Sequence, residues 1–317
     1  MPYAALMARL ALAFAFLLSA CGDDDGGTDA TPDAFVPGGD LGSGTDDAGG
    51  EESDAFVPPM DFGSDAGPVG SIGCRSGDGL ESGEHTFTLD DLERRYLLYL
   101  PTGYSADRAW PLIFALHGNG GSVSYWNSET GDRNIRGEVA DGAILVIAEA
   151  IDNAWRDYDM PRESWPARIE LELSYFDQLV DTMTGELCVD ENAIFSMGFS
   201  GGGSFSGVLG CRREYIRAIA VGGSVTYFDP ADCVATPAAW ITIGTEELTG
   251  GREDYRDFFR DLAGCESSTM ATDPDPCVDY DGCGATTPVH YCQHPGGHRW
   301  PDFGTEAAWS FFQRFVE

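Results

Sequence analysis

The chain has 317 residues and a formal net charge of −35, with 53 acidic residues against 18 basic ones. This balance argues against binding to nucleic acid or adsorption to anionic lipid, because both interactions need clusters of basic side chains. It favours solubility and disfavours acidic substrates.

Residues 1–20 are typical of a peptide that directs export. A single charge, Arg9, precedes an apolar run at residues 10–20, which is short for a membrane-spanning helix. The run ends in LSAC at residues 18–21, which resembles a bacterial lipobox, where the peptide is cut before the cysteine and the cysteine is lipidated. We therefore expect an exported protein held to the cell envelope, at the outer membrane or the cell surface, only through lipid on Cys21. The alternative is an ordinary secretory signal in which Cys21 has no role.

Residues 21–73 have the composition of a disordered linker. Between residues 22 and 73 the chain carries 13 acidic and no basic side chains, and it repeats DAFVP at 33–37 and 54–58. A segment with one sign of charge and few apolar residues does not bury enough surface to offset the entropy of ordering. Residues 74–317 remain, with 40 acidic and 17 basic side chains, a normal size for one α/β domain.

Short apolar runs within this domain predict strands. Runs that are fully apolar, without alternation, are typical of the interior of a mostly parallel sheet. In chain order, strands are expected at 95–100, 112–116, 143–148, 193–197, 216–221 and 240–243. Apolar residues at helical spacing predict a helix over 170–183, a second helix begins at Gly203, and a last one covers 306–316. Strands that alternate with helices predict an α/β fold, a mostly parallel sheet flanked by helices.

A G-x-S-x-G pattern centred on Ser200 occurs in FSMGFSGGGSF, residues 195–205. The pattern alone is weak, but a predicted strand precedes it and a predicted helix follows it. A nucleophile elbow requires this strand–turn–helix context, since its serine has a strained backbone and needs small neighbours. The start of the following helix also favours a developing negative charge. Ser200 is therefore the candidate nucleophile.

A serine nucleophile needs a base, and the base needs a third group to orient it. Three of the five histidines follow Ser200 in the chain. His298 comes after two glycines, in a loop before the last predicted helix, and is the expected base. His290 lies inside a probable strand and His294 near its end, so both are expected to be structural.

The candidate acid follows the predicted strand at 240–243. Glu246 and Glu247 come directly after Gly-Thr at 244–245, at the carboxyl edge of the predicted sheet, where catalytic groups collect. The residues alone leave the choice between the two acids open. Two solvated loop acids are the alternative reading.

The loop HGNGGS, residues 117–122, follows another predicted strand. Its backbone is placed to stabilise a tetrahedral oxyanion together with the N–H that follows the nucleophile. The expected donors are the backbone N–H groups of Asn119 and Gly201. His117 is expected to brace this loop by hydrogen bonding rather than to act as a base.

Together these pieces resemble the exported poly(3-hydroxybutyrate) depolymerase and feruloyl esterase family of α/β-hydrolases. The resemblance covers residues 94–317 and rests on RRYLLYLPTGY, WPLIFALHGNGGS, VDENAIFSMGFSGGG, ITIGTEE and GGHRWP. It implies an α/β-hydrolase fold, a triad of Ser200, His298 and Glu247, and no cofactor. The family usually has Gly-Thr-x-Asp at the acid, so Glu247 stands where an aspartate is usual. The Trp300 position lies near the active site in the family, with a core role as the alternative.

Eight cysteines follow Cys21. An even number in an exported chain indicates disulfides, here up to four, and the absence of a C-x-x-C pair disfavours zinc. Proximity in the sequence favours the pairs Cys265–Cys292 and Cys277–Cys283. The aspartates between these cysteines lack the spacing of an EF-hand, so no metal site is expected.

The sequence thus predicts a monomeric serine esterase that acts outside the cytoplasm without a cofactor. Its expected substrates are feruloyl or acetyl esters of polysaccharide, or polyhydroxyalkanoate oligomers, since fold and triad do not fix the substrate. Two other functions stay open. One is a serine peptidase, because the same triad hydrolyses amides, and the other is a catalytically silent binding protein displayed on the cell surface.

Overall fold

The computed structural model describes residues 70–76, 79–157 and 160–316. The predicted signal peptide, Cys21 and most of the predicted linker lie outside the described residues. No helix in the described ranges is long and apolar enough to cross a lipid bilayer.

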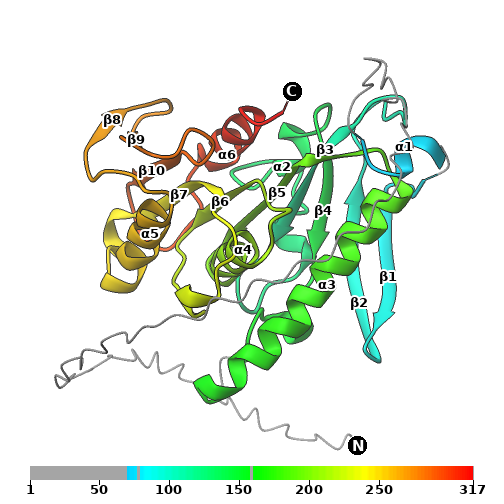
Figure 1. Cartoon of the computed structure of the whole chain (residues 1–317), viewed down its shortest axis with the longest axis horizontal. Helices are drawn as coiled ribbons and strands as arrows, with labels where there is room; N and C mark the ends of the chain where they lie inside the picture. The colour runs from blue at the N-terminus through cyan, green and yellow to red at the C-terminus, as the bar shows by residue number, and fades with distance from the viewer. Residues whose placement is uncertain (1–69, 77–78, 158–159, 317) are drawn as a thin grey trace, which may run out of the picture. The chain divides into compact units, whose positions relative to one another are not determined.

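A mixed sheet runs through the described part of the chain, in the strand order β1-β2-β4-β3-β5-β6-β7-β10-β9-β8 (Figure 1). Its strands are β1 (Gly83–Leu89), β2 (Leu92–Tyr99), β3 (Trp110–Leu116), β4 (Ile144–Ala148), β5 (Val189–Phe199), β6 (Ala218–Gly222), β7 (Ala238–Gly244), β8 (Thr269–Ala271), β9 (Cys277–Tyr280) and β10 (Val289–His294). The central strands from β4 to β10 are parallel, and antiparallel strands extend the sheet at both ends. The loops that follow the parallel strands therefore lie along one edge of the sheet.

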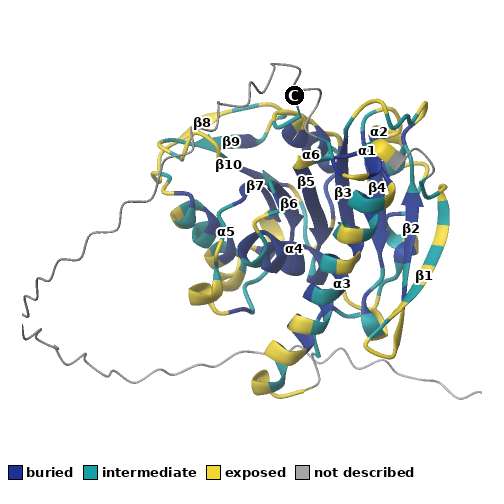
Figure 2. Ribbon diagram, turned by 45° about the vertical axis from the view of Figure 1, so that its right-hand side comes forward, coloured by how far each residue is buried: buried dark blue, intermediate teal, exposed yellow. Residues whose placement is uncertain are grey.

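Helices cover both faces of this sheet. They are α1 (Gly73–Ser76), α2 (Ile135–Glu138), α3 (Trp165–Glu186), α4 (Gly201–Arg212), α5 (Gly250–Leu262) and α6 (Gly304–Gln313), with short 3-10 helices η1 (Val123–Tyr125), η2 (Ile151–Asn153), η3 (Arg162–Ser164), η4 (Pro230–Asp232) and η5 (Thr245–Glu247). One face buries Phe176 of α3, Phe205 of α4 and Tyr255 of α5. The other face buries Ile135 of α2 and Phe312 of α6. Figure 2 shows the central strands buried between these layers.

The predicted arrangement of strands and helices is confirmed. Each of the six apolar runs forms a strand of the sheet, and the run at 193–197 is the inner part of the longer β5. The predicted helix at 170–183 is the middle of α3. The helix after Ser200 begins at Gly201, two residues before the expected start, because Ser200 itself occupies the N-cap position.

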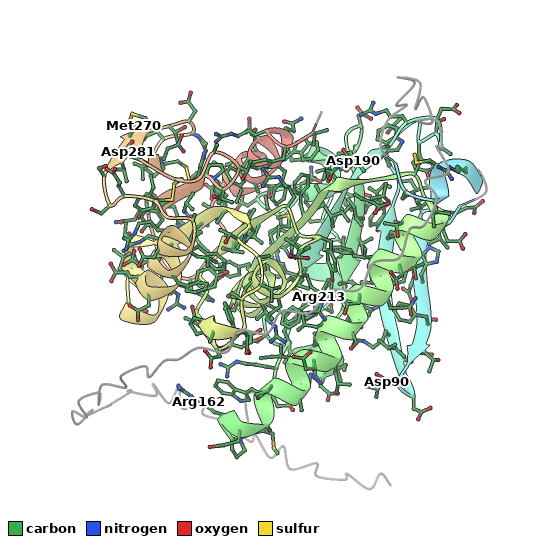
Figure 3. The ribbon with its side chains drawn as sticks, in the orientation of Figure 1. Asp90, Arg162, Asp190, Arg213, Met270 and Asp281 are labelled. Carbon is green, nitrogen blue, oxygen red and sulfur yellow. A yellow bond between two sulfur atoms is a disulfide. The ribbon has the colours of Figure 1, made fainter. Side chains whose placement is uncertain are left out.

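The strands at both ends of the sheet were not predicted from the sequence. Along β1, half-buried and exposed side chains alternate, as expected of a strand with one solvated face. Asp90 and Asp91 connect β1 to β2 with φ angles of 50° and 62°, the conformation of a two-residue hairpin turn; Figure 3 shows Asp90 at the tip. At the opposite end, β8 and β9 are short, and Met270 is largely exposed. Neither edge carries the continuous apolar run that identified the central strands.

Four disulfides form among the described residues: Cys74–Cys188, Cys211–Cys233, Cys265–Cys283 and Cys277–Cys292. The expected number is confirmed, but both predicted pairs, Cys265–Cys292 and Cys277–Cys283, are wrong. Cys277 and Cys292 lie opposite each other on the antiparallel strands β9 and β10. Cys265 and Cys283 lie just outside the two ends of the β8–β9 hairpin. Strand register, which proximity in the sequence does not reveal, therefore sets both pairs.

Candidate active site

Ser200 lies between the end of β5 and the start of α4. Its φ of 57° and ψ of −122° are sparsely populated for a residue with a side chain and cost about 1–3 kcal/mol. Two backbone hydrogen bonds hold this conformation: the Ser200 N–H donates to the Gly222 carbonyl at 2.7 Å, and the Ser204 N–H donates to the Ser200 carbonyl at 2.9 Å. The turn therefore projects the Ser200 hydroxyl from the carboxyl edge of the sheet.

Two glycines of the motif allow the backbone to approach closely at this turn. A Cβ atom on Gly198 would lie 2.4 Å from the carbonyl carbon of Gly202, and one on Gly202 would lie 2.2 Å from the backbone oxygen of Leu116. Neither contact is possible for a real side chain, and backbone atoms do not move aside. The G-x-S-x-G pattern is thus a packing requirement of this strand–turn–helix unit.

His298 lies in the loop between β10 and α6. Its Nε2 is 2.8 Å from Ser200 Oγ, and its ring centroid is 4.6 Å from that of Phe199. On another side the backbone of Gly223 approaches the imidazole so closely that a Cβ there would be 2.6 Å from the His298 Cε1. Packing from Phe199 and Gly223 restricts the ring to the orientation in which it faces Ser200.

Glu247 belongs to η5, directly after β7. Its Oε2 is 2.5 Å from His298 Nδ1, and its Oε1 accepts a hydrogen bond from the Gly244 N–H at 3.2 Å. The Glu247 side chain is buried, whereas Glu246 is exposed. Burial raises the pKa of Glu247, but the hydrogen bonds from His298 and Gly244, with the charges of His298 and Arg252, outweigh it and lower the pKa below its ordinary value. Of the two acids that the sequence left open, Glu247 is the one that contacts the imidazole.

Arg252, on the first turn of α5, is a neighbour that the sequence analysis missed. Its Nε lies 3.0 Å from Glu247 Oε2, and its Nη2 lies 3.2 Å from His298 Nδ1. It is one of 18 arginines in a chain without lysine, and no motif marks it. Only the packing of α5 against the end of β7 brings it to this position.

Asn119 and Gly201, the residues predicted to supply the oxyanion donors, contact each other through the Asn119 side chain. Gly201 occupies the first position of α4, where backbone N–H groups have no partner within the helix. The side chain of Asn119 lies over Gly201, since a Cβ on Gly201 would be 2.0 Å from Asn119 Oδ1. Gly118 also lies close to the hydroxyl, because a Cβ atom on Gly118 would be 3.9 Å from Ser200 Oγ. The loop after β3 and the start of α4 therefore meet beside the hydroxyl.

His117 braces the loop after β3, as predicted. It is fully buried; its Nδ1 donates to the Gly118 carbonyl at 2.7 Å, and its Nε2 accepts from the Ala150 N–H at 3.2 Å. The Trp155 indole N–H donates to the His117 carbonyl at 2.7 Å. Burial lowers the pKa of His117, although the Gly118 hydrogen bond and the charge of Glu149 oppose this. The ring therefore stays neutral, with its proton on Nδ1.

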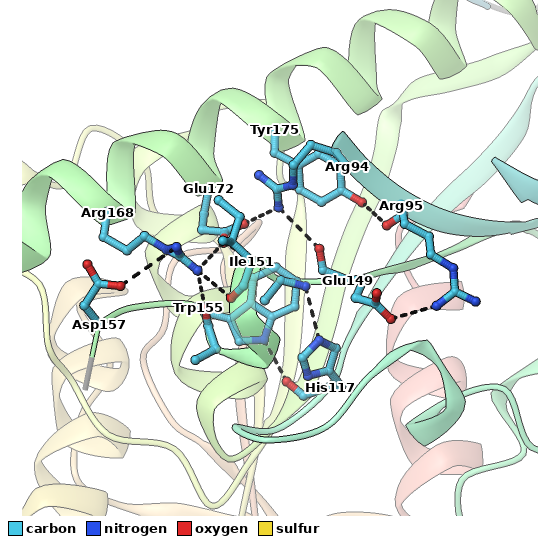
Figure 4. A network of polar contacts seen from close by, with 12 residues as sticks. Arg94, Arg95, His117, Glu149, Ile151, Trp155, Asp157, Arg168, Glu172 and Tyr175 are labelled. Atoms are coloured by element: carbon cyan, nitrogen blue, oxygen red, sulfur yellow. Dashed lines mark hydrogen bonds and ion pairs between the residues drawn. The ribbon is translucent and has the colours of Figure 1, made fainter. Parts of the chain in front are cut away.

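Behind this loop lies a buried ionic cluster, which we call the α3 cluster: Arg94, Arg168 and Glu172 (Figure 4). Glu172 lies 2.5 Å from Arg94 and 3.0 Å from Arg168, and all three side chains are at most 6% exposed. Glu172 also accepts a hydrogen bond from the Ile151 N–H at 3.1 Å. The α3 cluster thereby fixes the segment after β4, which the sequence analysis did not single out.

That segment in turn holds the loop after β3. Arg168 donates to the carbonyls of Ile151 and Ala154, both at 2.6 Å. Asn153, with a φ of 59°, accepts a hydrogen bond from the Gly120 N–H at 2.8 Å. A continuous set of contacts thus connects the buried charges of α3 to the residue that follows Asn119.

The other residues considered from the sequence lie in the interior. His290 is buried on β10, 2.7 Å from Asp279 and in contact with Arg314. His294 is buried at the end of β10 and donates from Nδ1 to the Pro295 carbonyl at 3.0 Å. Trp300 is buried, with its ring edge-on to Trp126 at 5.1 Å. The structural roles expected for the two histidines are confirmed, and Trp300 is a core residue close to Phe199.

Comparisons with known proteins agree with this architecture. No family model matches the chain. It is 28% identical to feruloyl esterase D of Neurospora crassa, over 77% of this chain and 90% of that protein. It is 27% identical to feruloyl esterase C of Emericella nidulans, over 69% and 83%. An esterase of Thermogutta terrifontis solved with butyrate has a TM-score of 0.53 at 15% identity, covering 74% of this chain and 95% of that one. The fold is that of an α/β-hydrolase.

Proposed function

We propose that this protein is a serine esterase in which Ser200, His298 and Glu247 form the catalytic triad. The observation that carries the proposal is the hydrogen-bonded series from Ser200 Oγ to His298 Nε2 at 2.8 Å and from His298 Nδ1 to Glu247 at 2.5 Å. The serine of this series lies on a strained strand–helix turn. Three side chains from separate loops meet in the order that nucleophilic catalysis requires.

In the first half of the reaction, Ser200 Oγ attacks the carbonyl carbon of the ester while His298 Nε2 takes the hydroxyl proton. Glu247 holds the Nδ1–H of the imidazole and stabilises the imidazolium that forms. The carbonyl oxygen becomes an oxyanion, which accepts hydrogen bonds from the backbone N–H groups of Asn119 and Gly201. When the intermediate collapses, the bond to the alcohol breaks, and the alcohol leaves with the proton from Nε2.

In the second half, water attacks the acyl group on Ser200. His298 takes a proton from this water, and the same two N–H groups hold the second oxyanion. Collapse releases the carboxylic acid, and the proton returns from Nε2 to Ser200 Oγ. All protons are exchanged among the substrate, water and the triad, so the cycle needs no cofactor.

Feruloyl esters are the first substrate class to test. The curated relatives reported above are named feruloyl esterases. Next to Ser200, the ring of Phe199 stacks on that of Tyr125 with a centroid distance of 6.1 Å, and aromatic groups favour aromatic partners. Acetyl esters of polysaccharide and polyhydroxyalkanoate oligomers are the other proposed substrates.

The proposed place of action is outside the cytoplasm, with lipid on Cys21 as the anchor. The four disulfides support an oxidising compartment. Cys21→Ala is expected to abolish the incorporation of labelled fatty acid and to release the protein from membranes. Labelling that persists in Cys21→Ala would contradict the anchor and leave the esterase proposal untouched.

Hydrolysis of p-nitrophenyl acetate, p-nitrophenyl butyrate and methyl ferulate by the purified protein tests the function. Wild type is compared with Ser200→Ala, His298→Ala and Glu247→Gln, and with Glu246→Gln as the matched control for the acid. We expect turnover by wild type and Glu246→Gln, and a loss of about 10³-fold or more in the serine and histidine variants. An inert but folded wild type, or a fully active Ser200→Ala, would refute the proposal. Preference for p-nitroanilides over esters would indicate a peptidase instead.

A further inference from the structure

The guanidinium of Arg252 contacts both partners of the proposed acid–base pair. Its Nε lies 3.0 Å from Glu247 Oε2, the same oxygen that lies 2.5 Å from His298 Nδ1. Its Nη2 lies 3.2 Å from that nitrogen. The Arg252 side chain is 21% exposed and that of Glu247 is 7% exposed, so solvent screens this interaction less than it screens a surface ion pair.

One consequence concerns the ionisation of Glu247. A cation 3.0 Å from the carboxylate favours its charged form and contributes to the lowered pKa of Glu247. Ionised Glu247 accepts the Nδ1–H of His298, which leaves the lone pair of Nε2 free to take the serine proton. If Glu247 is protonated, Arg252 can instead donate to Nδ1 at the observed 3.2 Å. The ring proton is then on Nε2, and His298 is not a base toward Ser200.

A second consequence concerns the imidazolium. When Nδ1 carries its proton toward Glu247, the Nη2 of Arg252 and the Nδ1–H are two donors that face each other and do not form a hydrogen bond. An imidazolium at His298 and the Arg252 guanidinium carry like charges, with Nη2 3.2 Å from Nδ1. Arg252 therefore supports the ionised form of Glu247 under acidic conditions and costs some rate at neutral pH through this repulsion in the transition state.

The other charged groups near His298 are more distant or already paired. Arg299, the next residue in the chain, is paired with Asp302 at 2.6 Å. Glu246 on η5 is exposed, with its Oε2 3.5 Å from the position of a Cβ on Gly297. The segment from Gly223 to Phe228 carries no charged side chain. Arg252 is thus the cation that directly contacts the pair.

From this geometry we infer that Arg252 is a positioning residue that extends the activity of the triad to acidic pH. The inference rests on the proposed function. Arg252 acts through Glu247 and His298 and is not required for bond formation itself. A purely structural role in holding α5 to β7 would lower activity equally at every pH.

The test is the pH profile of kcat/KM between pH 4.5 and 9 for wild type, Arg252→Gln and Arg252→Lys. In Arg252→Gln we expect the acid limb to move up by about 0.5–1 pH unit, with activity about three- to tenfold lower at pH 5. At pH 8 the variant should match or exceed wild type, so that the two profiles cross. Arg252→Lys keeps the charge and should restore most of the acid limb. Arg256→Gln is the matched control one turn along α5, because Arg256 is paired with Asp257 at 2.8 Å.

The rate of covalent labelling of Ser200 by a p-nitrophenyl phosphonate, measured over the same pH range, distinguishes failure of the proposed function from failure of the inference about Arg252. If wild type is labelled but hydrolyses no ester, the proposed function fails, and the shift in labelling between wild type and Arg252→Gln still tests the inference. Parallel profiles for wild type and Arg252→Gln, displaced by the same factor at every pH, would overturn the inference. An acid limb in Arg252→Lys that shifts as far as that of Arg252→Gln would also overturn it, because charge would then not be the cause.

Discussion

His298 and His117 occupy loops at the same edge of the sheet, and each has both ring nitrogens engaged, yet their surroundings are opposite. The partners of His298 are the side chains of Ser200, Glu247 and Arg252, and its own side chain is 40% exposed. The partners of His117 are the backbone groups of Gly118 and Ala150, and it is fully buried. One ring contacts charged and hydroxyl side chains, and the other joins two backbone segments.

The partners of a histidine, more than its place in a motif, thus distinguish the catalytic role proposed for His298 from the bracing role of His117. Backbone carbonyl and amide groups do not titrate, so the pair of contacts made by His117 fixes one neutral tautomer. With a carboxylate at Nδ1 and a hydroxyl at Nε2, the ring of His298 is arranged to accept a proton at Nε2 and return it there. Substitution of His298 is therefore expected to lower activity, whereas substitution of His117 or of the contacts behind it is expected to change stability.

The largest effect is expected for His298→Ala. Removal of the proposed base should lower kcat for ester hydrolysis by about 10³–10⁵-fold. Because the ring is partly exposed and lies in a loop, the midpoint of thermal unfolding should stay within a few degrees of wild type. Esterase assays beside thermal denaturation measure both quantities. A large loss of stability in His298→Ala would mean that His298, like His117, holds the fold together, and this would contradict the difference between the two histidines.

Next in size is the effect of Glu172→Gln in the α3 cluster. The substitution removes the anion between the buried Arg94 and Arg168 and leaves Arg168 only the more distant Asp157, at 3.9 Å, which costs about 3–5 kcal/mol of the free energy of unfolding. Because Glu172 also holds the Ile151 N–H, activity should fall together with stability. The control is Glu170→Gln on the exposed side of α3, where the ion pair with Arg212 at 2.7 Å contributes less than about 1 kcal/mol. Urea denaturation of both variants gives the comparison, and equal losses would contradict the role assigned to the α3 cluster.

The region around Ser200 and the α3 cluster also differ in how far the sequence predicts them. The strand–turn–helix unit around Ser200 and the loops after β3, β7 and β10 follow from local patterns, because each motif is continuous in the chain. The partners of the α3 cluster are not continuous: Arg94 and Glu172 are 78 residues apart. In the helical pattern of 170–183, Glu172 follows the apolar Leu171 and offers no sign of its full burial. Arg252 and the disulfide pairs were missed for the same reason, since tertiary packing and strand register decide them.

The pH dependence of stability gives a smaller effect at His117. Its pKa is lowered in the folded state by burial, so below the ordinary histidine pKa of about 6.5 the unfolded chain binds a proton that the folded state does not. The free energy of unfolding should therefore fall as the pH decreases from 7 to 5, by about 1–2 kcal/mol from this residue. His117→Gln removes this contribution. Urea denaturation at both pH values should show a shallower decrease for His117→Gln than for wild type, and equal decreases would exclude His117 as a source.

The smallest effect concerns the strained backbone of Ser200. Ser200→Ala and Ser200→Gly both lose the hydroxyl and its hydrogen bond to His298, but only glycine adopts a φ near the observed 57° without strain. Ser200→Gly should therefore be more stable than Ser200→Ala by about 1 kcal/mol. Thr249, the N-cap residue of α5 with a φ of −123°, offers the control, because glycine and alanine there differ by an ordinary capping preference without relief of strain. If the gap between glycine and alanine at Ser200 does not exceed that at Thr249, the elbow stores no strain energy. A larger difference in the free energy of unfolding at Ser200 would mean that the strained turn that presents the hydroxyl to His298 lowers the stability of the fold.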